Sequence, residues 1–387
     1  MRKAVIIKAK RTPVGKVGGI LKNFPPEELA ASVIRDLLKE TGCPVDRIDD
    51  VILGNVVGPG GNMARLSLLT AGLSVDIPGV TVDRQCGSGL EAINMACRFV
   101  QAGAGDIYIA GGVESTSLAP WKIEKPPTIY DHKPPKIFTK ARFSPDHIGD
   151  PDMGVAAENV AEKYDISRKD QDRYALFSHL KAAASQRSGR FDKEITPLEQ
   201  MTDHLIDKDE CPRPNTSIEK LERLKPVFTE DGTVTAGNAC PVNDGAAAAL
   251  VMSAEKAKEL GLSADLEFID AVTVGVDPNI LGIGPVPAVK TLISRNNISI
   301  NDISYVEFNE AFASQVLASL RNLDISEDIV NHGGGALALG HPYGASGAIL
   351  VTRLCTEASN YQGEYMLATL GVGGGMGMAT LFKSIVS

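Results

Sequence analysis

The chain has 387 residues, of which 43% are hydrophobic and 22% charged, and its formal net charge is -9 at pH 7. This length predicts two or more domains, and the composition is typical of a globular α/β protein. The negative charge argues against a nucleic-acid-binding surface or a polybasic membrane patch, and no apolar run reaches the roughly 18 residues that a membrane span needs.

The start of the chain and its cysteines bear on where the protein works. The segment MRKAVIIKAKRTPVG begins with basic residues but lacks the long apolar core of a signal peptide, so it predicts a first strand. The six cysteines are scattered without CxxC pairs, which predicts reduced thiols and no zinc or other metal site. We therefore expect a cytoplasmic protein that binds neither nucleic acid nor membrane.

Two pairs of similar stretches predict a duplication within the chain. Residues 37–56 have the order helix, turn, strand and polar tip, and residues 292–311 repeat it. Residues 86–112 have the order turn, helix and apolar strand, and residues 345–371 repeat that order. The two pairs have nearly the same separation along the chain. The alternative to a duplication is that any two α/β units show the same order of helix, turn and strand.

The spacing of apolar residues predicts the elements of one copy. Apolar residues recur every three or four positions from Leu90 to Val100, which predicts a helix, and Ile107–Ala110 form the continuous apolar run of a strand buried on both faces. Strands that alternate with helices predict largely parallel sheets covered by helices. Residues 118–238, between the copies, are rich in proline and charge and then helical from about 154 to 190. Such a loop-rich insertion often carries substrate-binding residues.

Two short glycine-flanked stretches carry the candidate chemistry. Cys86 precedes the sequence GSG and a predicted helix, where backbone N–H groups and the helix dipole favour a thiolate. His341 lies in GHPYGASG, which also runs into a helix, and Ser346 there matches Ser88. If the copies pack as a pseudo-dimer, Cys86 and His341 meet at their interface, as nucleophilic acyl transfer requires. A buried structural cysteine is the alternative for Cys86, and the other five histidines are interpreted as surface or loop residues.

Several stretches of the chain, in order and spacing, resemble the motifs of the thiolase family: VDRQCGSG, TVTAGNACPVNDGAAAAL, FNEAFA, GHPYGASGA and GVGGGMG. The resemblance covers nearly the whole chain. It implies a five-layered αβαβα fold built from two duplicated halves, namely residues 1–117 plus 239–262 and residues 263–387, with an inserted loop domain at 118–238. It also implies coenzyme A thioesters as substrates, an acyl-cysteine intermediate, no separate cofactor, and a homodimer or homotetramer.

Within these motifs the resemblance implies roles for single residues. Cys86 matches the acylated nucleophile and His341 the base that activates it. Asn309 matches a residue that orients a water in one oxyanion hole, and the backbone N–H groups of Cys86 and Gly373 match a second. The residues matched to coenzyme A binding are Arg213 at the nucleotide, Phe312 at the pantetheine tunnel, and Met153, Ala236 and Cys240.

Three positions depart from the family pattern. Gly371 stands where the family has a cysteine that serves as acid and base for the second substrate. Cys240 replaces a serine that commonly contacts coenzyme A, and Asp152 replaces a histidine. Loss of an acid/base group costs a factor of about 10²–10⁴ in rate. Cys240 is a candidate replacement, although filling the volume of the serine is the favoured interpretation.

Three functions are consistent with these residues. The leading one is an acetyl-CoA C-acetyltransferase or 3-ketoacyl-CoA thiolase with an acyl-Cys86 intermediate, in which Gly371 impairs the Claisen or thiolysis step. The second is a thiolase-like acyltransferase whose second substrate arrives already activated. The third is a non-catalytic homologue that binds acyl-CoA, and the retained Cys86, His341 and Asn309 argue against it.

Overall fold

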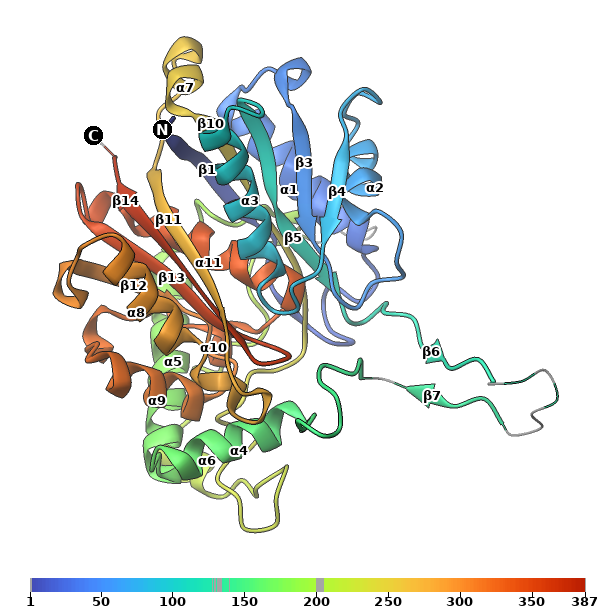
Figure 1. Ribbon diagram of the computed structural model, residues 1–387, viewed down its shortest axis with the longest axis vertical. Helices are drawn as coiled ribbons and strands as arrows, with labels where there is room; N and C mark the ends of the chain where they lie inside the picture. Colours follow the sequence, from blue (N-terminus) through green and yellow to red (C-terminus); the bar gives the residue numbers. More distant parts are fainter. Residues whose placement is uncertain are drawn as a thin grey trace.

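A mixed β-sheet of ten strands runs through the middle of the protein (Figure 1). The computed structural model describes residues 2–126, 128, 130, 134–138, 140–199 and 205–386. Within this part the strands follow the order β12-β13-β14-β11-β1-β10-β5-β3-β4, with β2 paired to β10. The bounds are β1 (Ala4–Arg11), β2 (Gly15–Lys16), β3 (Asp50–Gly54), β4 (Gly79–Val82), β5 (Ile107–Ser115), β10 (Asn243–Ser253), β11 (Leu266–Gly275), β12 (Ile303–Phe308), β13 (Tyr365–Val372) and β14 (Met376–Ser384).

The sheet consists of two halves with the same strand order. In the first half β1, β10, β5 and β3 lie side by side, and in the second half β11, β14, β13 and β12 do. In the first half β1 with β10 and β10 with β5 are antiparallel, and β5 with β3 is parallel. In the second half β11 with β14 and β14 with β13 are antiparallel, and β13 with β12 is parallel. Val330 forms a parallel bridge to Val306, where the first half has β4 beside β3. The predicted duplication is therefore confirmed, and a short antiparallel pairing of β1 with β11 joins the halves.

The expectation of largely parallel sheets is wrong. Among the described strands of the sheet, only β3 with β4 and β5, and β12 with β13, run parallel. A tight turn joins β13 to β14, and in it Gly374 and Gly375 have φ angles of 86° and 81°. Strands joined by so short a hairpin must run antiparallel. An alternation of strands and helices in the sequence does not reveal such a hairpin.

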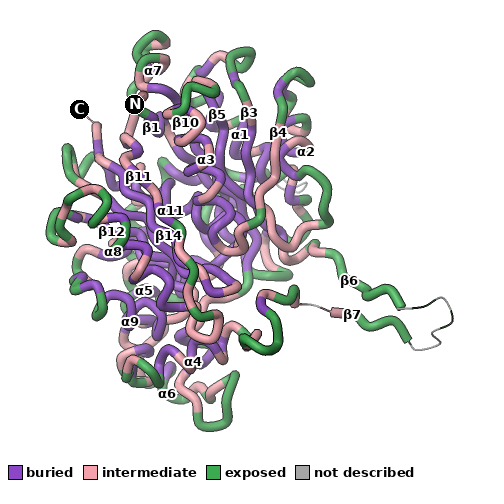
Figure 2. Tube along the Cα trace, in the orientation of Figure 1, coloured by how far each residue is buried: buried purple, intermediate pink, exposed green. Residues whose placement is uncertain are grey.

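Helices lie between the two half-sheets and on both outer faces. The apolar side chains of α3 and α11 form one core with the inner faces of both half-sheets. Helices α1 and α2 cover the outer face of the first half, and α8 and α9 that of the second. This is the predicted αβαβα architecture, and Figure 2 shows buried residues along its strands and central helices. The bounds are α1 (Pro26–Thr41), α2 (Met63–Thr70), α3 (Ser88–Ala102), α8 (Pro285–Arg295), α9 (Ala313–Leu323) and α11 (Tyr343–Glu357).

Strand β5 illustrates why these residues form a buried strand. Tyr108 and Ala110 pack into the core that contains α3, whereas Ile107 and Ile109 pack into the core on the outer face. Successive side chains of a strand point to opposite faces. Since both faces are covered by helices, the whole run is apolar, as predicted.

The long helices of the insertion pack onto the second half, whereas Leu198 and Ile206 pack into the outer core of the first half. Helix α4 (Met153–Lys163) packs against α9 and the 3₁₀ turn η2 (Pro278–Ile283), and α5 (Arg168–Ser188) packs against α9 and α10 (Ala336–Leu339). The strands β6 (Lys122–Ile123) and β7 (Ile137–Phe138) project away from the body in Figure 1. The remaining elements are α6 (Ile218–Glu222), α7 (Ala254–Leu260), β8 (Leu198–Glu199), β9 (Leu205–Ile206), η1 (Val45–Arg47), η3 (Ile300–Asp302), η4 (Glu327–Ile329) and η5 (Ala358–Asn360). None of the helices in the described ranges is long and apolar enough to cross a membrane.

The two central helices touch through their backbones near their first turns. A Cβ atom at Gly89 would lie 2.7 Å from the carbonyl oxygen of Gly344, and one at Gly347 would lie 2.4 Å from the backbone nitrogen of Leu90. Both distances are shorter than side chains tolerate, so glycine is required at both positions. The contact brings the start of α3, preceded by Cys86, next to the start of α11, preceded by His341.

We predict that Gly347→Ala destabilises the protein. An alanine in the middle of a helix is normally more favourable than glycine by about 1 kcal/mol. Here the added methyl would push α11 away from α3, and overpacking of this kind costs about 1–3 kcal/mol. The urea unfolding midpoint should therefore fall. The matched control is Gly275→Ala, because a Cβ there meets nothing within 4 Å. Equal midpoints for the two variants would contradict the close packing.

Candidate active site

A tight turn between β4 and α3 presents Cys86. Gln85 has a positive φ of 46°, which is rare for a residue with a side chain. Two neighbours hold it there: Asp83 accepts a hydrogen bond from the Gln85 N–H at 2.7 Å, and the Ser88 hydroxyl donates to the Gln85 carbonyl at 2.6 Å. Ser88 also accepts from the Arg84 N–H at 2.8 Å. The turn therefore fixes the direction of Cys86, and Ser88 is its main support.

The Cys86 thiol is desolvated and accepts hydrogen bonds from the backbone N–H groups of Cys86 and Gly373. Burial, and to a lesser extent the charges of Glu114 and Asp83, raises the pKa of the thiol to about 11, although the two N–H groups act in the opposite direction. The backbone N–H groups favour a thiolate, as predicted, but the net shift of the pKa is in the opposite direction. Desolvation outweighs the backbone dipoles, and Cys86 is a neutral thiol at neutral pH.

His341 is held at both its backbone and its ring. Its N–H donates to the Asn243 side chain at 2.8 Å, and its Nδ1 is hydrogen-bonded to the Ser346 hydroxyl at 2.6 Å. The other ring nitrogen, Nε2, is buried and has no hydrogen-bond partner among the described residues. Burial lowers the pKa of His341 to about 4. The imidazole is therefore neutral and oriented, with one nitrogen free to take a proton.

Asn309 lies just beyond β12, in a loop that a buried glutamate anchors. The Asn309 N–H donates to the Thr369 carbonyl at 3.0 Å, and its Nδ2 is buried without a partner in the described part of the chain. The neighbouring Glu310 carboxylate accepts hydrogen bonds from four groups, the side chains of Tyr174, Ser178 and Asn331 and the backbone N–H of Leu337. Sequence reasoning missed this role of Glu310, because its donors come from three distant segments.

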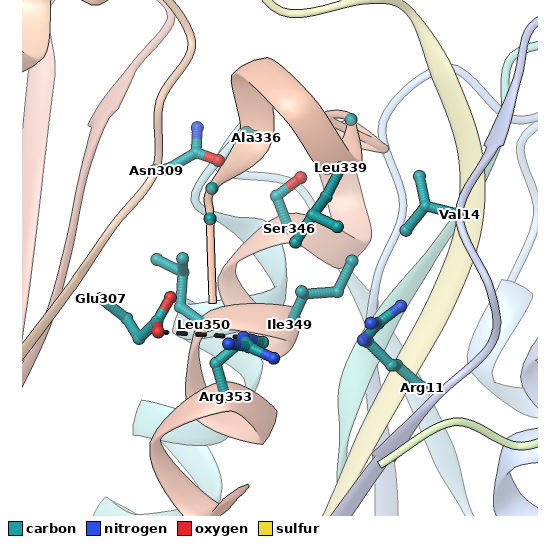
Figure 3. A pocket seen from close by; sticks show the side chains of 13 residues that line it. Arg11, Val14, Glu307, Asn309, Ala336, Leu339, Ser346, Ile349, Leu350 and Arg353 are labelled. Carbon is teal, nitrogen blue, oxygen red and sulfur yellow. Dashed lines mark ion pairs between the residues drawn. The ribbon is translucent and has the colours of Figure 1, made fainter. Parts of the chain in front are cut away.

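A small internal cavity of about 20 Å³ lies beside Asn309 and Ser346 (Figure 3). Its volume is close to that of one water molecule. Arg353 and Glu307 line it and lie 3.8 Å apart. Nε of Arg353 is the atom that faces Glu307 in this ion pair, but neither it nor Nη2 has a hydrogen-bond partner among the described residues. The cavity therefore has charged side chains in its lining, and it adjoins Ser346, whose hydroxyl is hydrogen-bonded to His341.

A larger cleft of about 430 Å³ contains three of the residues that the resemblance implies for coenzyme A. Ala236 and Cys240 line it, and Arg213 is exposed at its edge. Phe228 lines it as well, and its ring packs edge-to-face against Phe312 at 6.3 Å. Met153 is the first residue of α4, whose second residue, Gly154, packs against the Phe228 ring. Phe228 was not predicted, because one aromatic residue in a loop gives no local signal.

One histidine is not where the sequence predicted. His179 is buried on α5 rather than lying at the surface or in a loop, and it lines the same cleft. Its Nδ1 accepts a hydrogen bond from the Arg213 N–H at 3.2 Å. Burial, with a smaller effect of Arg213, lowers the pKa of His179 to about 4. Its neighbours on α5 are mixed in polarity, so the helix pattern did not show which face is buried. His132 and His204 lie outside the described residues.

Known proteins share both the fold and the chain's full length. The family model described as "Thiolase, N-terminal domain" matches residues 4–255, and "Thiolase, C-terminal domain" matches residues 263–384. This chain belongs to the thiolase family. It is 52% identical over 383 residues to "Putative acetyl-CoA C-acetyltransferase VraB" of Staphylococcus haemolyticus, with 99% of each chain covered.

Solved thiolase structures agree with this one over nearly their whole length. The acetyl-CoA acetyltransferase of Bacillus anthracis is 39% identical with a TM-score of 0.95, and the match covers 100% of this chain and 99% of that one. Human mitochondrial 3-ketoacyl-CoA thiolase in complex with CoA is 35% identical with a TM-score of 0.93, covering 99% and 98%. The protein thus has the predicted thiolase fold and is an acyltransferase of the thiolase type.

In this thiolase Cys240 connects the cleft wall to the surroundings of Cys86. Burial, and then the charge of Cys86, raises the pKa of Cys240, so the two thiols lie within electrostatic range of each other. Tyr343 lies within range of both, and its ring packs edge-on against His341 at 5.3 Å. No group of three or more metal-ligating side chains occurs among the residues with a described position.

The space beside Gly371 is occupied. A Cβ atom at this position would lie 2.6 Å from Nε2 of Gln315, a residue of the first turn of α9. Gln315 is 2% exposed, and its Nε2 has no hydrogen-bond partner in the described ranges. An amide is not a proton-transfer group at neutral pH, so neither residue can act as acid or base.

We predict that acylation of Cys86 by acetyl-CoA is independent of pH between about 5 and 9. The imidazole of His341 is neutral above its lowered pKa of about 4, and the Cys86 thiol is neutral below its raised pKa of about 11. The neutral pair that reacts is therefore present across this range. Rapid-quench mass spectrometry of the acetyl adduct measures the rate. A rate that rises with a midpoint near 6.5, as for an ordinary histidine, would contradict the prediction.

Proposed function

We propose that this thiolase is an acetyl-CoA C-acetyltransferase or a 3-ketoacyl-CoA thiolase that acts through an acyl-Cys86 intermediate. One observation carries the proposal: a desolvated thiol with two backbone N–H groups on its sulfur lies within electrostatic range of Cys240, which lines a large cleft together with an exposed arginine. The names of the relatives support this substrate class, because they are an acetyltransferase acting on acetyl-CoA and a 3-ketoacyl-CoA thiolase.

The first half-reaction uses Cys86 and His341. The Cys86 sulfur attacks the carbonyl carbon of the acyl-CoA while its proton moves to Nε2 of His341, which has no competing partner in the described part. Ser346 keeps the ring oriented through Nδ1. The tetrahedral intermediate then collapses, and the CoA sulfur leaves with the electron pair and takes the proton from His341. Cys86 now carries the acyl group as a thioester, and His341 is neutral again.

The negative charge that forms on the thioester oxygen needs preorganised donors. We assign one oxyanion hole to the backbone N–H groups of Cys86 and Gly373, which bond the thiol in the free enzyme. The second oxyanion hole belongs to Asn309, whose buried Nδ2 is free to hold a water there. A single donor of this kind contributes about 10²–10³ in rate.

The cleft accommodates coenzyme A as a substrate, with no separate cofactor in the proposed reaction. Arg213, exposed at the edge, suits the anionic nucleotide, because guanidinium groups form strong charge-assisted hydrogen bonds to phosphate. The less polar pantetheine arm runs past Ala236 and Cys240. Phe312 and Met153 lie around Phe228 and complete this wall.

We also propose a division of the chain and its assembly. Residues 1–117 plus 239–262 and residues 263–387 form the two catalytic halves, and residues 118–238 form the loop domain that covers the cleft. Strand β4 is at the edge of the sheet, and all four of its residues are partly exposed. An exposed edge strand is a template for pairing with another chain. This supports a homodimer, which can pair further into a homotetramer.

Acetyl transfer to Cys86 is the direct test of the proposed function. Incubation with acetyl-CoA should add one acetyl group to the intact protein, and Cys86→Ala should abolish the adduct. Asn309→Ala should slow its formation by a factor of about 10²–10³, because one oxyanion donor is lost. Asn322→Ala is the matched control, since this asparagine is exposed on α9. Absence of an adduct in the unmodified protein would rule out the proposed function.

We expect Arg213 to contribute to the binding of coenzyme A thioesters and not to the bond-making steps. We expect Arg213→Ala to raise the KM for acetoacetyl-CoA about tenfold or more and to leave kcat nearly unchanged, because one charge-assisted hydrogen bond to the nucleotide is lost. Acetoacetyl-pantetheine, which lacks the nucleotide, should react equally well with both proteins. Arg223→Ala is the control, an exposed arginine that does not line the cleft. An equal effect on both substrates would show that Arg213 does not contact the nucleotide.

A further inference from the structure

Carbon–carbon bond formation requires a proton transfer that acylation of Cys86 does not. Once Cys86 carries an acetyl group, a second acetyl-CoA must lose a proton from its Cα atom before it can attack. In the cleavage direction the same carbon must gain a proton. A positioned acid/base contributes about 10²–10⁴ in rate to such a step. The group responsible must lie beside both Cys86 and the cleft.

The position of Gly371 does not provide this group. Glycine has no side chain, and the adjacent volume holds the Gln315 amide, which is 2.6 Å from where a Cβ would be. The required acid/base therefore belongs to another element of the site.

Cys240 is held where such a group is needed. Its backbone N–H donates to the carbonyl of Ala311 at 3.0 Å, two residues after Asn309. The residues on either side of it bridge the same two loops, since Ala239 pairs with Phe312 and Val242 pairs with His341. The segment that carries Cys240 is thus fixed between the Asn309 loop and the His341 loop.

Cys240 lies beside the path proposed for the substrate and close in sequence to the bridge with the His341 loop. Its side chain lines the cleft proposed for the pantetheine arm, and it lies within electrostatic range of Cys86 and Tyr343. Nε2 of His341, which is 2% exposed, has no hydrogen-bond partner among the described residues. No described group therefore competes for the lone pair of this nitrogen, which leaves it available to accept a proton.

We propose that Cys240 is the catalytic acid/base for the Cα proton in the carbon–carbon bond step, in place of a side chain at position 371. The proposal rests on the proposed function, because it concerns the second substrate of the same acyl-Cys86 intermediate. It gives Cys240 a chemical role in addition to its place in the cleft wall.

The step balances with three protein groups. Cys240 gives its thiol proton to Nε2 of His341, and the thiolate removes a Cα proton from the second acetyl-CoA. The resulting carbanion attacks the acetyl carbonyl carbon on Cys86, so the carbon–carbon bond forms and the bond from that carbon to the Cys86 sulfur breaks. The sulfur keeps the electron pair and takes the proton from His341. Acetoacetyl-CoA leaves, and both thiols and the neutral imidazole are restored.

The test separates the two half-reactions in the full-length protein. Exchange of labelled CoA into acetyl-CoA measures the first half-reaction, and exchange of Cα hydrogen for deuterium in acetyl-CoA in D₂O measures the action of the base. We expect Cys240→Ser to lower the deuterium exchange and the kcat for acetoacetyl-CoA thiolysis by at least about 100-fold more than it lowers the CoA exchange. The KM should change little. Cys355→Ser, which lies away from the cleft in a pocket with Lys8 and Asp265, should behave like the unmodified protein.

Each other outcome has a definite meaning. If Cys240→Ser keeps deuterium exchange and thiolysis within about threefold, Cys240 is only part of the wall and the proposal is wrong. If the variant loses CoA exchange to the same extent, Cys240 supports the whole site and the proposal is also overturned. If the unmodified protein exchanges CoA but not deuterium, no base acts on Cα, and transfer to an already activated acceptor is favoured. Failure of CoA exchange in the unmodified protein would instead reject the proposed function.

Discussion

The backbone contact between α3 and α11 is the constraint on which the site depends. Gly89 and Gly347 let the two helices approach until their first turns touch, and Cys86 and His341 immediately precede those turns. A buried carboxylate reinforces the contact: Glu114 accepts hydrogen bonds from the N–H groups of Val56, Val57 and Gly344, each at 3.1 Å. It thus ties the loop after β3 to the first turn of α11. A shift of either helix would move Cys86 and His341 apart.

Close packing also determines the protonation state of the reactive pair. Burial raises the pKa of Cys86 to about 11 and lowers that of His341 to about 4, because a low-dielectric site disfavours both charged forms. The resting pair is therefore thiol and imidazole, not thiolate and imidazolium. Proton transfer then accompanies attack on a thioester. The same exclusion of water protects an acyl thioester from hydrolysis.

The sequence predicts those features that local patterns encode. The duplication follows from repeated helix and strand patterns, and the placement of Cys86 and His341 before the two central helices follows from the glycines next to them, whereas the five layers follow from the resemblance to thiolases. The antiparallel pairings, the burial of His179, the donors around Glu310 and the desolvation of Cys86 depend on contacts between distant segments. The amide of Gln315 beside Gly371 is a further example, since these residues lie on different elements and only the fold brings them together.

The duplication explains how one scaffold supplies two different reactive groups. Ser88 and Ser346 occupy matching positions in the two halves, and each serine organises the turn that precedes its helix. Ser88 bonds the backbone around Gln85 and so directs Cys86, whereas Ser346 bonds the ring of His341. The insertion breaks this symmetry, because it occurs in one half only and its long helices pack on the other. The two turns therefore differ in what they present, a cysteine from the first copy and a histidine from the second.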